Sequence, residues 1–350
     1  MIVSVITRTT TKTGPGASFL FGLFISLVLP GCSDAPEQLV FSGLTMGTTY
    51  QVKVVPGDVS VPSKLGETIQ ATLEQLDSTF STYQPDSELM SLNRAPIDEL
   101  VSVSEPMWRV LLISEQVFRL TGGAFDPTVG PLVNLWGFGP DLSQDRVPER
   151  SKIQKQVNRI GLNKLALDPQ VPSVRRTADI QLDLSAVAKG YAVDVVAELL
   201  DSLELGNYLV EVGGELRTNG LKLNGKPWRI AIESPTLERR EVQQALSLGS
   251  AGIATSGDYR NYFERGGKRY SHTIDPRTGF PISHQLASVT VIAENTAYAD
   301  ALATGLMVMG HSEALALAEK NDLAVYMLVK EGAEFRAYYS SAFAPYLSGD

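Results

Sequence analysis

Helix and strand patterns alternate along this chain without a strict strand–helix–strand period, which indicates the α+β class. Apolar residues recur at steps of three and four, and this spacing predicts helices over 65–80, 105–121, 184–205, 295–310 and 312–320. Runs rich in β-branched residues predict strands over 52–55, 208–212, 228–232, 287–292 and 324–329. With 43% hydrophobic residues, the chain can bury a sizeable core.

The main body of the chain carries no sign of division. No linker rich in proline and serine and no internal repeat interrupts it, so we expect residues 39–350 to form one catalytic unit. The polar stretch 140–174 is expected to be surface elaboration.

The first 31 residues have the pattern of a signal peptide. Arg8 and Lys12 precede an apolar run at 17–29, which is shorter than the roughly 20 residues that a membrane-spanning helix needs. Cys32 follows directly and resembles the cysteine of a bacterial lipobox, which implies lipidation and a tether at 32–38. The alternative is an ordinary secretory signal with an incidental cysteine. We expect a lipid-anchored protein of the bacterial cell envelope, facing the periplasm from the inner or the outer membrane.

Composition and missing motifs exclude several function classes. A formal charge of −9 argues against nucleic acid as a partner. One cysteine and three histidines cannot supply a disulfide, a thiolate zinc site or an iron–sulfur cluster. The chain also lacks the P-loop, dinucleotide-fold and serine-hydrolase signatures.

The segment 183–190 combines an acid, a serine and a lysine at the start of a predicted helix. Helix amides together with Lys189 favour a phosphate or diphosphate group. The alternative is a capped helix with a solvent-exposed lysine. The small residues Ala186, Ala188 and Gly190 would allow a ligand to approach closely, which favours a binding site.

Asp300 and Thr304 are four residues apart in a segment that is otherwise almost entirely apolar, so they share one helical face. A lone aspartate in such surroundings is costly to bury without a cation or strong donors. Two oxygen ligands one turn apart suit magnesium, or alternatively calcium. In the structural alternative, Thr304 bonds to a backbone carbonyl and Asp300 pairs with an arginine.

Two further segments carry candidate site residues. His272 has an acid three residues away, Asp275, and the two could serve as a base and its orienting partner. The alternative is a turn built on the sequence around Asp275. In the second segment Phe125 precedes Asp126, and its ring could face a ligand or belong to the core.

Seven motifs in this order closely resemble the ApbE family, over roughly residues 40–330. They are Met46-Gly47-Thr48-Thr49-Tyr50, Gly122-Gly123-Ala124-Phe125-Asp126-Pro127, residues 183–194, Val212-Gly213-Gly214-Glu215, residues 254–259, residues 272–281 and residues 299–304. The resemblance implies an α+β fold related to the T-fold, with mixed sheets and packed helices.

The resemblance also implies an activity, FAD:protein FMN transfer. Such an enzyme cleaves the diphosphate of FAD with a divalent cation, links FMN to a threonine of an acceptor protein and releases AMP. The family's acceptors are flavoprotein subunits of membrane redox complexes, such as the sodium-pumping NADH:quinone reductase or a related electron-transport complex. Two alternatives remain: hydrolysis of FAD in the same site, and a flavin-binding lipoprotein without chemistry.

By motif position, the resemblance assigns roles to individual residues. Those implied to contact FAD are Met46, Tyr83, Ala124, Phe125, Asp126, Asp183, Lys189 and Ile274. The metal, magnesium with calcium as the alternative, would be held by the Ala186 carbonyl, Asp300 and Thr304. Lys189 would neutralise phosphate charge, and His272 or Asp275 is the candidate base for the acceptor hydroxyl.

Overall fold

The computed structural model describes residues 37–139, 147–168, 170–235, 242–258, 262–265 and 267–347. Contacts group Pro36–Asp350 into one compact unit and separate Met1–Ala35 from it. The predicted signal segment, Cys32 and the first part of the tether lie outside the described residues. Within the described ranges, none of the helices has the length and apolar character required to cross a membrane.

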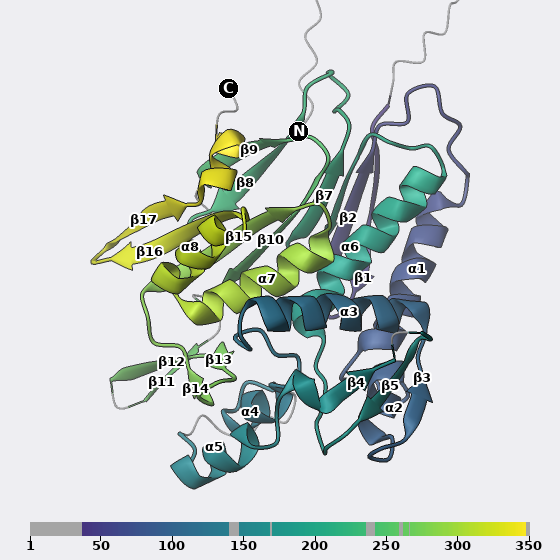
Figure 1. The fold of residues 1–350 in the computed structure, drawn as a ribbon. Coiled ribbons are helices and arrows are strands. Elements are labelled where there is room, and N and C mark those ends of the chain that lie inside the picture. The colour runs from purple at the N-terminus through teal and green to yellow at the C-terminus, as the bar shows by residue number, and fades with distance from the viewer. Residues whose placement is uncertain are drawn as a thin grey trace, which may run out of the picture. The chain divides into compact units, whose positions relative to one another are not determined.

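An antiparallel sheet of eight strands forms the centre of this unit (Figure 1). Its strands, in spatial order, are β1 (Leu39–Thr45), β2 (Thr48–Val54), β6 (Tyr208–Val212), β7 (Glu215–Asn219), β10 (Ala251–Gly257), β15 (Leu286–Ala293), β16 (Ala324–Glu331) and β17 (Glu334–Tyr339). Successive side chains of a strand point to opposite faces, so a face needs a cover only where it carries apolar side chains.

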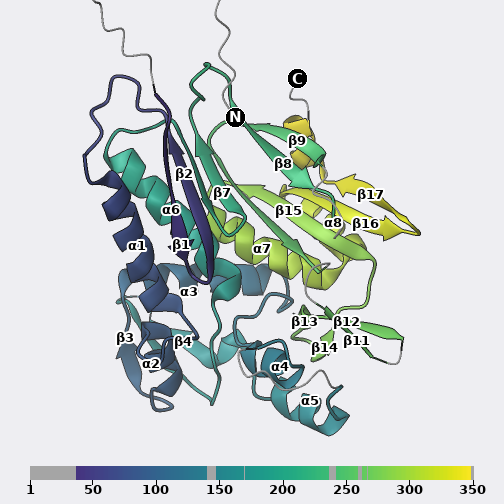
Figure 2. The ribbon, with the colours of Figure 1, turned by 180° about the vertical axis from the view of Figure 1, so that it is seen from behind.

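Helices cover one face of the sheet, and a hairpin covers part of the other. Helices α6 (Ser185–Ser202) and α7 (Thr296–Met309) lie in front of the sheet in Figure 1 and behind it in Figure 2. Three more helices, α1 (Leu65–Phe80), α3 (Glu105–Leu120) and α8 (His311–Lys320), extend this layer. The hairpin consists of β8 (Trp228–Glu233) and β9 (Val242–Leu248). Together with the 3-10 helix η2 (Ser341–Leu347), it packs on Ile253 and Leu328 of the sheet and forms a second core. The mixture of helices and sheets confirms the predicted α+β class.

Helix α7 is apolar on all sides because neighbours surround it. It packs against α6, α3 and strands β10 and β15, so almost every one of its side chains is buried. Glycines allow the closest approaches: a Cβ at Gly190 would lie 2.5 Å from the carbonyl oxygen of Thr296. The buried carboxylate of Asp194 accepts hydrogen bonds from the amides of Thr296 and Ala297, at 2.9 and 2.8 Å. These contacts fix the start of α7 against the second turn of α6.

Smaller elements lie beside the helical layer. They are α2 (Glu88–Arg94), the sheet of β3 (Leu100–Ser102), β5 (Ser173–Arg176) and β4 (Leu165–Leu167), the helices α4 (Gly130–Leu135), α5 (Arg150–Val157) and η1 (Leu162–Lys164), and the hairpins β11 (Tyr262–Arg265) with β12 (Lys268–Ser271) and β13 (Ile274–Asp275) with β14 (Phe280–Pro281).

The expectation that 140–174 is surface elaboration is wrong for the part that the structure describes. This part contributes α5, η1, β4 and the start of β5. Ile153 belongs to a third small core with Trp136, whereas Leu165 and Val174 join the main core. Strands of three or four residues are too short to show a periodic pattern, and the apolar residues here are widely spaced among polar ones. The sequence pattern therefore indicates surface elaboration and does not reveal these elements.

Candidate active site

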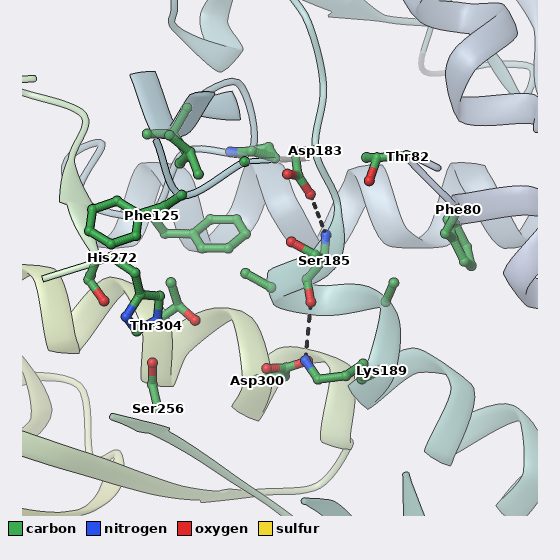
Figure 3. Close-up of a pocket in the computed structure, with 18 of the residues that line it drawn as sticks. Phe80, Thr82, Phe125, Asp183, Ser185, Lys189, Ser256, His272, Asp300 and Thr304 are labelled. Carbon is green, nitrogen blue, oxygen red and sulfur yellow. Dashed lines mark hydrogen bonds and ion pairs between the residues drawn. The ribbon is translucent and has the colours of Figure 1, made fainter. Parts of the chain in front are cut away.

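One cavity of about 760 Å³ gathers almost all of the predicted site residues (Figure 3). It is bordered by the start of α6, the middle of α7, the segment after α1 and the end of β10. Its lining includes Met46, Tyr83, Ala124, Phe125, Asp126, Asp183, Ala186, Lys189, His272, Ile274, Asp300 and Thr304. Of the predicted residues that the structure describes, Asp275 alone is not in this lining.

Lys189 lies among three oxygen groups in the first turns of α6. Its Nζ donates a hydrogen bond to the Ser185 carbonyl at 3.1 Å and lies 3.5 Å from Glu215 Oε1 and 3.7 Å from Asp300 Oδ2. Burial alone would lower the pKa of Lys189, but the carboxylates of Asp300 and Glu215 outweigh it and raise the pKa above its ordinary value. The ammonium group therefore stays charged, and the solvated-lysine alternative does not apply.

Asp300 is buried on α7 and faces α6. Its Oδ2 accepts a hydrogen bond from the Gly190 amide at 3.1 Å, and its cationic neighbour is Lys189 instead of an arginine. Burial raises the pKa of Asp300, although Lys189 and the Gly190 amide oppose the rise. Thr304, one turn further along α7, lines the same cavity.

Glu215 is a site residue to which the sequence analysis gave no role. It begins β7 directly after Gly213 and Gly214, whose φ angles of +63° and +107° form the turn that brings it to the cavity. Burial and the negative charge of Asp300 raise the pKa of Glu215 to about 8, against the opposing effect of Lys189. The motif Val212-Gly213-Gly214-Glu215 was the available signal, because a glycine pair before an acid at a strand start indicates a tight turn.

The donors around Asp300 fit a hard divalent cation. The Asp300 carboxylate, the Thr304 hydroxyl and the Ala186 carbonyl belong to residues of one cavity wall, and all three are oxygen ligands. One oxygen of Glu215 is buried without a hydrogen-bond partner nearby. Within the described ranges no three His, Cys, Asp or Glu side chains converge.

Two other acids of the cavity wall shape its backbone. The Asp183 carboxylate accepts a hydrogen bond from the Ser185 amide at 2.9 Å, and its own amide donates to the Pro127 carbonyl at 2.7 Å. Asp126 accepts from the amide and hydroxyl of Thr128, at 2.8 and 2.7 Å, and burial raises its pKa. Both acids therefore hold the segments that approach the start of α6.

The apolar part of the lining combines buried and exposed side chains. Phe125 is 2% exposed and packs against α7 near Gly305, so it belongs to the core and to the cavity wall at once. Tyr83 is 77% exposed, and Met46 takes a φ of +47° in the turn between β1 and β2. These two residues provide an aromatic and a flexible thioether group at the cavity, which suit contact with a planar ring.

Of His272 and Asp275, only His272 belongs to the cavity lining. His272 lines the cavity with its ring edge-on to Phe138, 6.4 Å between ring centres. The Asp275 carboxylate binds Arg277 through both oxygens at 3.0 Å and also accepts the Arg277 amide at 2.9 Å. Asp275 therefore closes a turn, as the alternative interpretation predicted, and does not reach the cavity. His272 is left as the candidate base.

Comparisons with known proteins agree with these observations. A profile of the ApbE family matches residues 46–327. A Vibrio cholerae protein named FAD:protein FMN transferase is 45% identical over 332 residues, covering 95% of this chain and 99% of its own. The solved structure of flavin transferase ApbE from Vibrio cholerae has a TM-score of 0.82 at 43% identity and covers 89% of this chain and 100% of that one.

A second solved structure, the flavinyl transferase ApbE of Pseudomonas stutzeri, has a TM-score of 0.83 at 41% identity and covers 90% of this chain and 98% of that one. The resemblance read from the motifs and the fold that it implied are thereby confirmed. The chain belongs to the ApbE family.

Proposed function

We propose that this chain is an FAD:protein FMN transferase that depends on a divalent cation. The observation that carries the proposal is the charged Lys189 held beside Asp300 at the start of α6, inside a cavity of about 760 Å³. This volume falls in the upper part of the usual range for ligand sites, about 300–1,000 Å³. We infer the reaction from the names of the relatives, and the residues of the cavity provide charged groups suited to it.

The diphosphate of FAD would lie at the start of α6. The Lys189 ammonium neutralises negative charge on the phosphate oxygens, and the amides of the first helical turn favour the same anion. Lys189 is oriented by three contacts, so its position does not depend on the substrate. Magnesium held by Asp300, Thr304 and the Ala186 carbonyl would supply further charge neutralisation on the diphosphate.

His272 would accept the proton of the acceptor threonine. The threonine oxygen then bonds to the phosphorus of the FMN half, the bond from that phosphorus to the bridging oxygen breaks, and AMP leaves with this oxygen. Histidine is the side chain that most often serves as a general base. Phe138 packs against the ring and limits its orientations.

The acceptor and the location are also proposals. The names of the relatives specify a protein acceptor, and we propose that this acceptor is a flavoprotein subunit of a membrane redox complex. The signal-like segment before Cys32 supports a lipid anchor and a place at the periplasmic side of the envelope.

The direct test is incubation of the purified protein with FAD, magnesium and a candidate acceptor subunit, followed by mass spectrometry of the acceptor. We expect an FMN adduct on the acceptor and one AMP per adduct. An acceptor with valine at the modified threonine is the matched control and should stay unmodified. Free FMN and AMP without an adduct would indicate hydrolysis, and intact FAD would indicate binding alone. Either result contradicts the proposal.

A further inference from the structure

Glu215 has one carboxylate oxygen in use and one without a partner. Its side chain is 7% exposed, and Oε1 lies 3.5 Å from the Lys189 ammonium. Oε2 is buried and has no hydrogen-bond partner among the described residues. A buried carboxylate oxygen without a partner is costly, so such an atom indicates a group that binds there.

This unpartnered oxygen differs from the others because its residue lines the cavity. Several other side chains in the described ranges have buried polar atoms without partners, but Glu215 alone among them belongs to the cavity lining. Glu215 therefore belongs to the wall of the proposed FAD site, where a ligand or a bound ion could supply the donor that its Oε2 lacks.

The local charges point to a cation with its waters. Lys189 Nζ lies within 3.7 Å of both Glu215 and Asp300, so one ammonium serves two buried carboxylates. When both carboxylates are ionised, one negative charge is left over, which is unfavourable in a buried site unless a further cation balances it. The ammonium lies near both carboxylates, so Glu215 Oε1 already has a cationic partner and only Oε2 is open.

We propose, on the basis of the proposed function, that Glu215 is a further acidic member of the cation site. Its Oε2 accepts a hydrogen bond from a water on the divalent cation that Asp300, Thr304 and the Ala186 carbonyl hold. Magnesium usually keeps several waters in proteins, and carboxylates that accept from such groups orient the site. Oε1 meanwhile keeps Lys189 in place while Asp300 is engaged by the cation.

The test is isothermal titration of the purified protein with magnesium, in the absence of FAD. We expect Glu215→Gln to weaken magnesium binding on the order of 10–100-fold, the usual effect of removing a group that orients a metal site. Glu215→Asp keeps the charge but withdraws the carboxylate by about 1.5 Å, and it should also weaken binding. Glu211→Gln is the matched control. Glu211 is a half-buried glutamate of the preceding strand β6, it accepts a hydrogen bond from the Gly214 amide, and it is not in the cavity lining. Its replacement should leave the affinity for magnesium unchanged.

Wild-type affinity in Glu215→Gln would overturn the inference. If Glu215→Asp keeps the full affinity for magnesium and Glu215→Gln loses it, then the negative charge of residue 215 acts alone. That result would refute the hydrogen bond from Oε2 to a water. Thermal unfolding without magnesium provides a second readout. Glu215→Gln should melt no lower than wild type, because Lys189 and Asp300 remain as a neutral pair and the glutamine oxygen can still accept from Lys189. A clear drop would show that the free protein needs the second carboxylate, which contradicts the argument that this carboxylate awaits a cation.

Failure of the wider proposal would look different. If the wild-type protein binds no magnesium, the cation site and the role of Glu215 fall together. If magnesium binds as predicted and the acceptor is still not modified, the proposed transfer fails and the role of Glu215 stands.

Discussion

Replacing Gly190 by alanine tests whether the contact between α6 and α7 builds the site. A Cβ at this position would lie 2.5 Å from the Thr296 carbonyl oxygen, 2.8 Å from its carbonyl carbon and 2.9 Å from the Ala297 Cα. All three are backbone atoms, so no side chain can rotate away to make room. Ordinary contacts begin near 3.4 Å, so the helices must separate by about 1 Å.

The size of the effect follows from that displacement. Inserting a methyl group into a packed core costs about 1–3 kcal/mol, and the better helix propensity of alanine returns up to about 1 kcal/mol. We therefore expect a modest loss in the free energy of unfolding and a melting temperature lower by a few degrees. Activity should suffer more, because the separation moves Lys189 away from Asp300. A misplacement of about 1 Å can cost on the order of 100-fold in rate.

The assay is differential scanning fluorimetry together with the initial rate of acceptor modification. Gly130→Ala is the matched control: it is also a helical glycine, but its Cβ would lie 3.5 Å from Asp183 Cβ, an ordinary contact. We expect the control to keep wild-type stability and rate. A Gly190→Ala protein with the rate of the control would refute the idea that this close approach positions the catalytic groups.

Three other changes test separate parts of the account. Asp300→Asn should lower magnesium-dependent turnover on the order of 100-fold or more, because charge stabilisation by a metal is worth several kcal/mol. The circular dichroism spectrum should stay unchanged. Unchanged magnesium dependence would refute the assignment of Asp300 as a ligand. Burial lowers the pKa of His284 below its usual value, so the unfolded chain binds a proton that the folded protein does not. Stability should therefore fall as pH drops below about 6.5, and His284→Asn should show a smaller fall in melting temperature between pH 7.5 and 5.5; an equal fall would contradict this. Cys32→Ser should release the protein from membranes in cell fractionation, and persistent membrane association would count against lipidation.

The helices that form the site could be predicted because their signals are local. The apolar spacing in 65–80 and in 295–310 corresponds to α1 and α7, and the serine at 104 caps α3 as its position suggests. The need of Asp300 for a cationic neighbour could be predicted as well, since a lone buried acid is costly. The sequence pattern indicates a metal ion or an arginine as that neighbour, and the structure places Lys189 there. The motif order then identified the family.

Other features depend on contacts between distant segments. The strand order of the eight-stranded sheet, with β7 next to β10, follows from long-range pairing that the sequence pattern does not record. Glu215 reaches the cavity because of that pairing and of the glycine turn before it. Asp275 was a plausible partner for His272 by spacing, but its strong local pairing with Arg277 turns it elsewhere. Spacing in the sequence alone cannot decide whether His272 or Arg277 is the partner of Asp275.

The central claim is that the diphosphate of FAD binds beside Lys189 at the start of α6, next to a divalent cation held by Asp300 and Thr304. A crystal structure of the protein soaked with FAD and manganese tests it most directly, because manganese gives an anomalous signal. We predict an anomalous peak in contact with Asp300 and Thr304, and a diphosphate group within hydrogen-bond distance of Lys189. A manganese peak elsewhere, or a diphosphate bound away from the start of α6, would contradict the account.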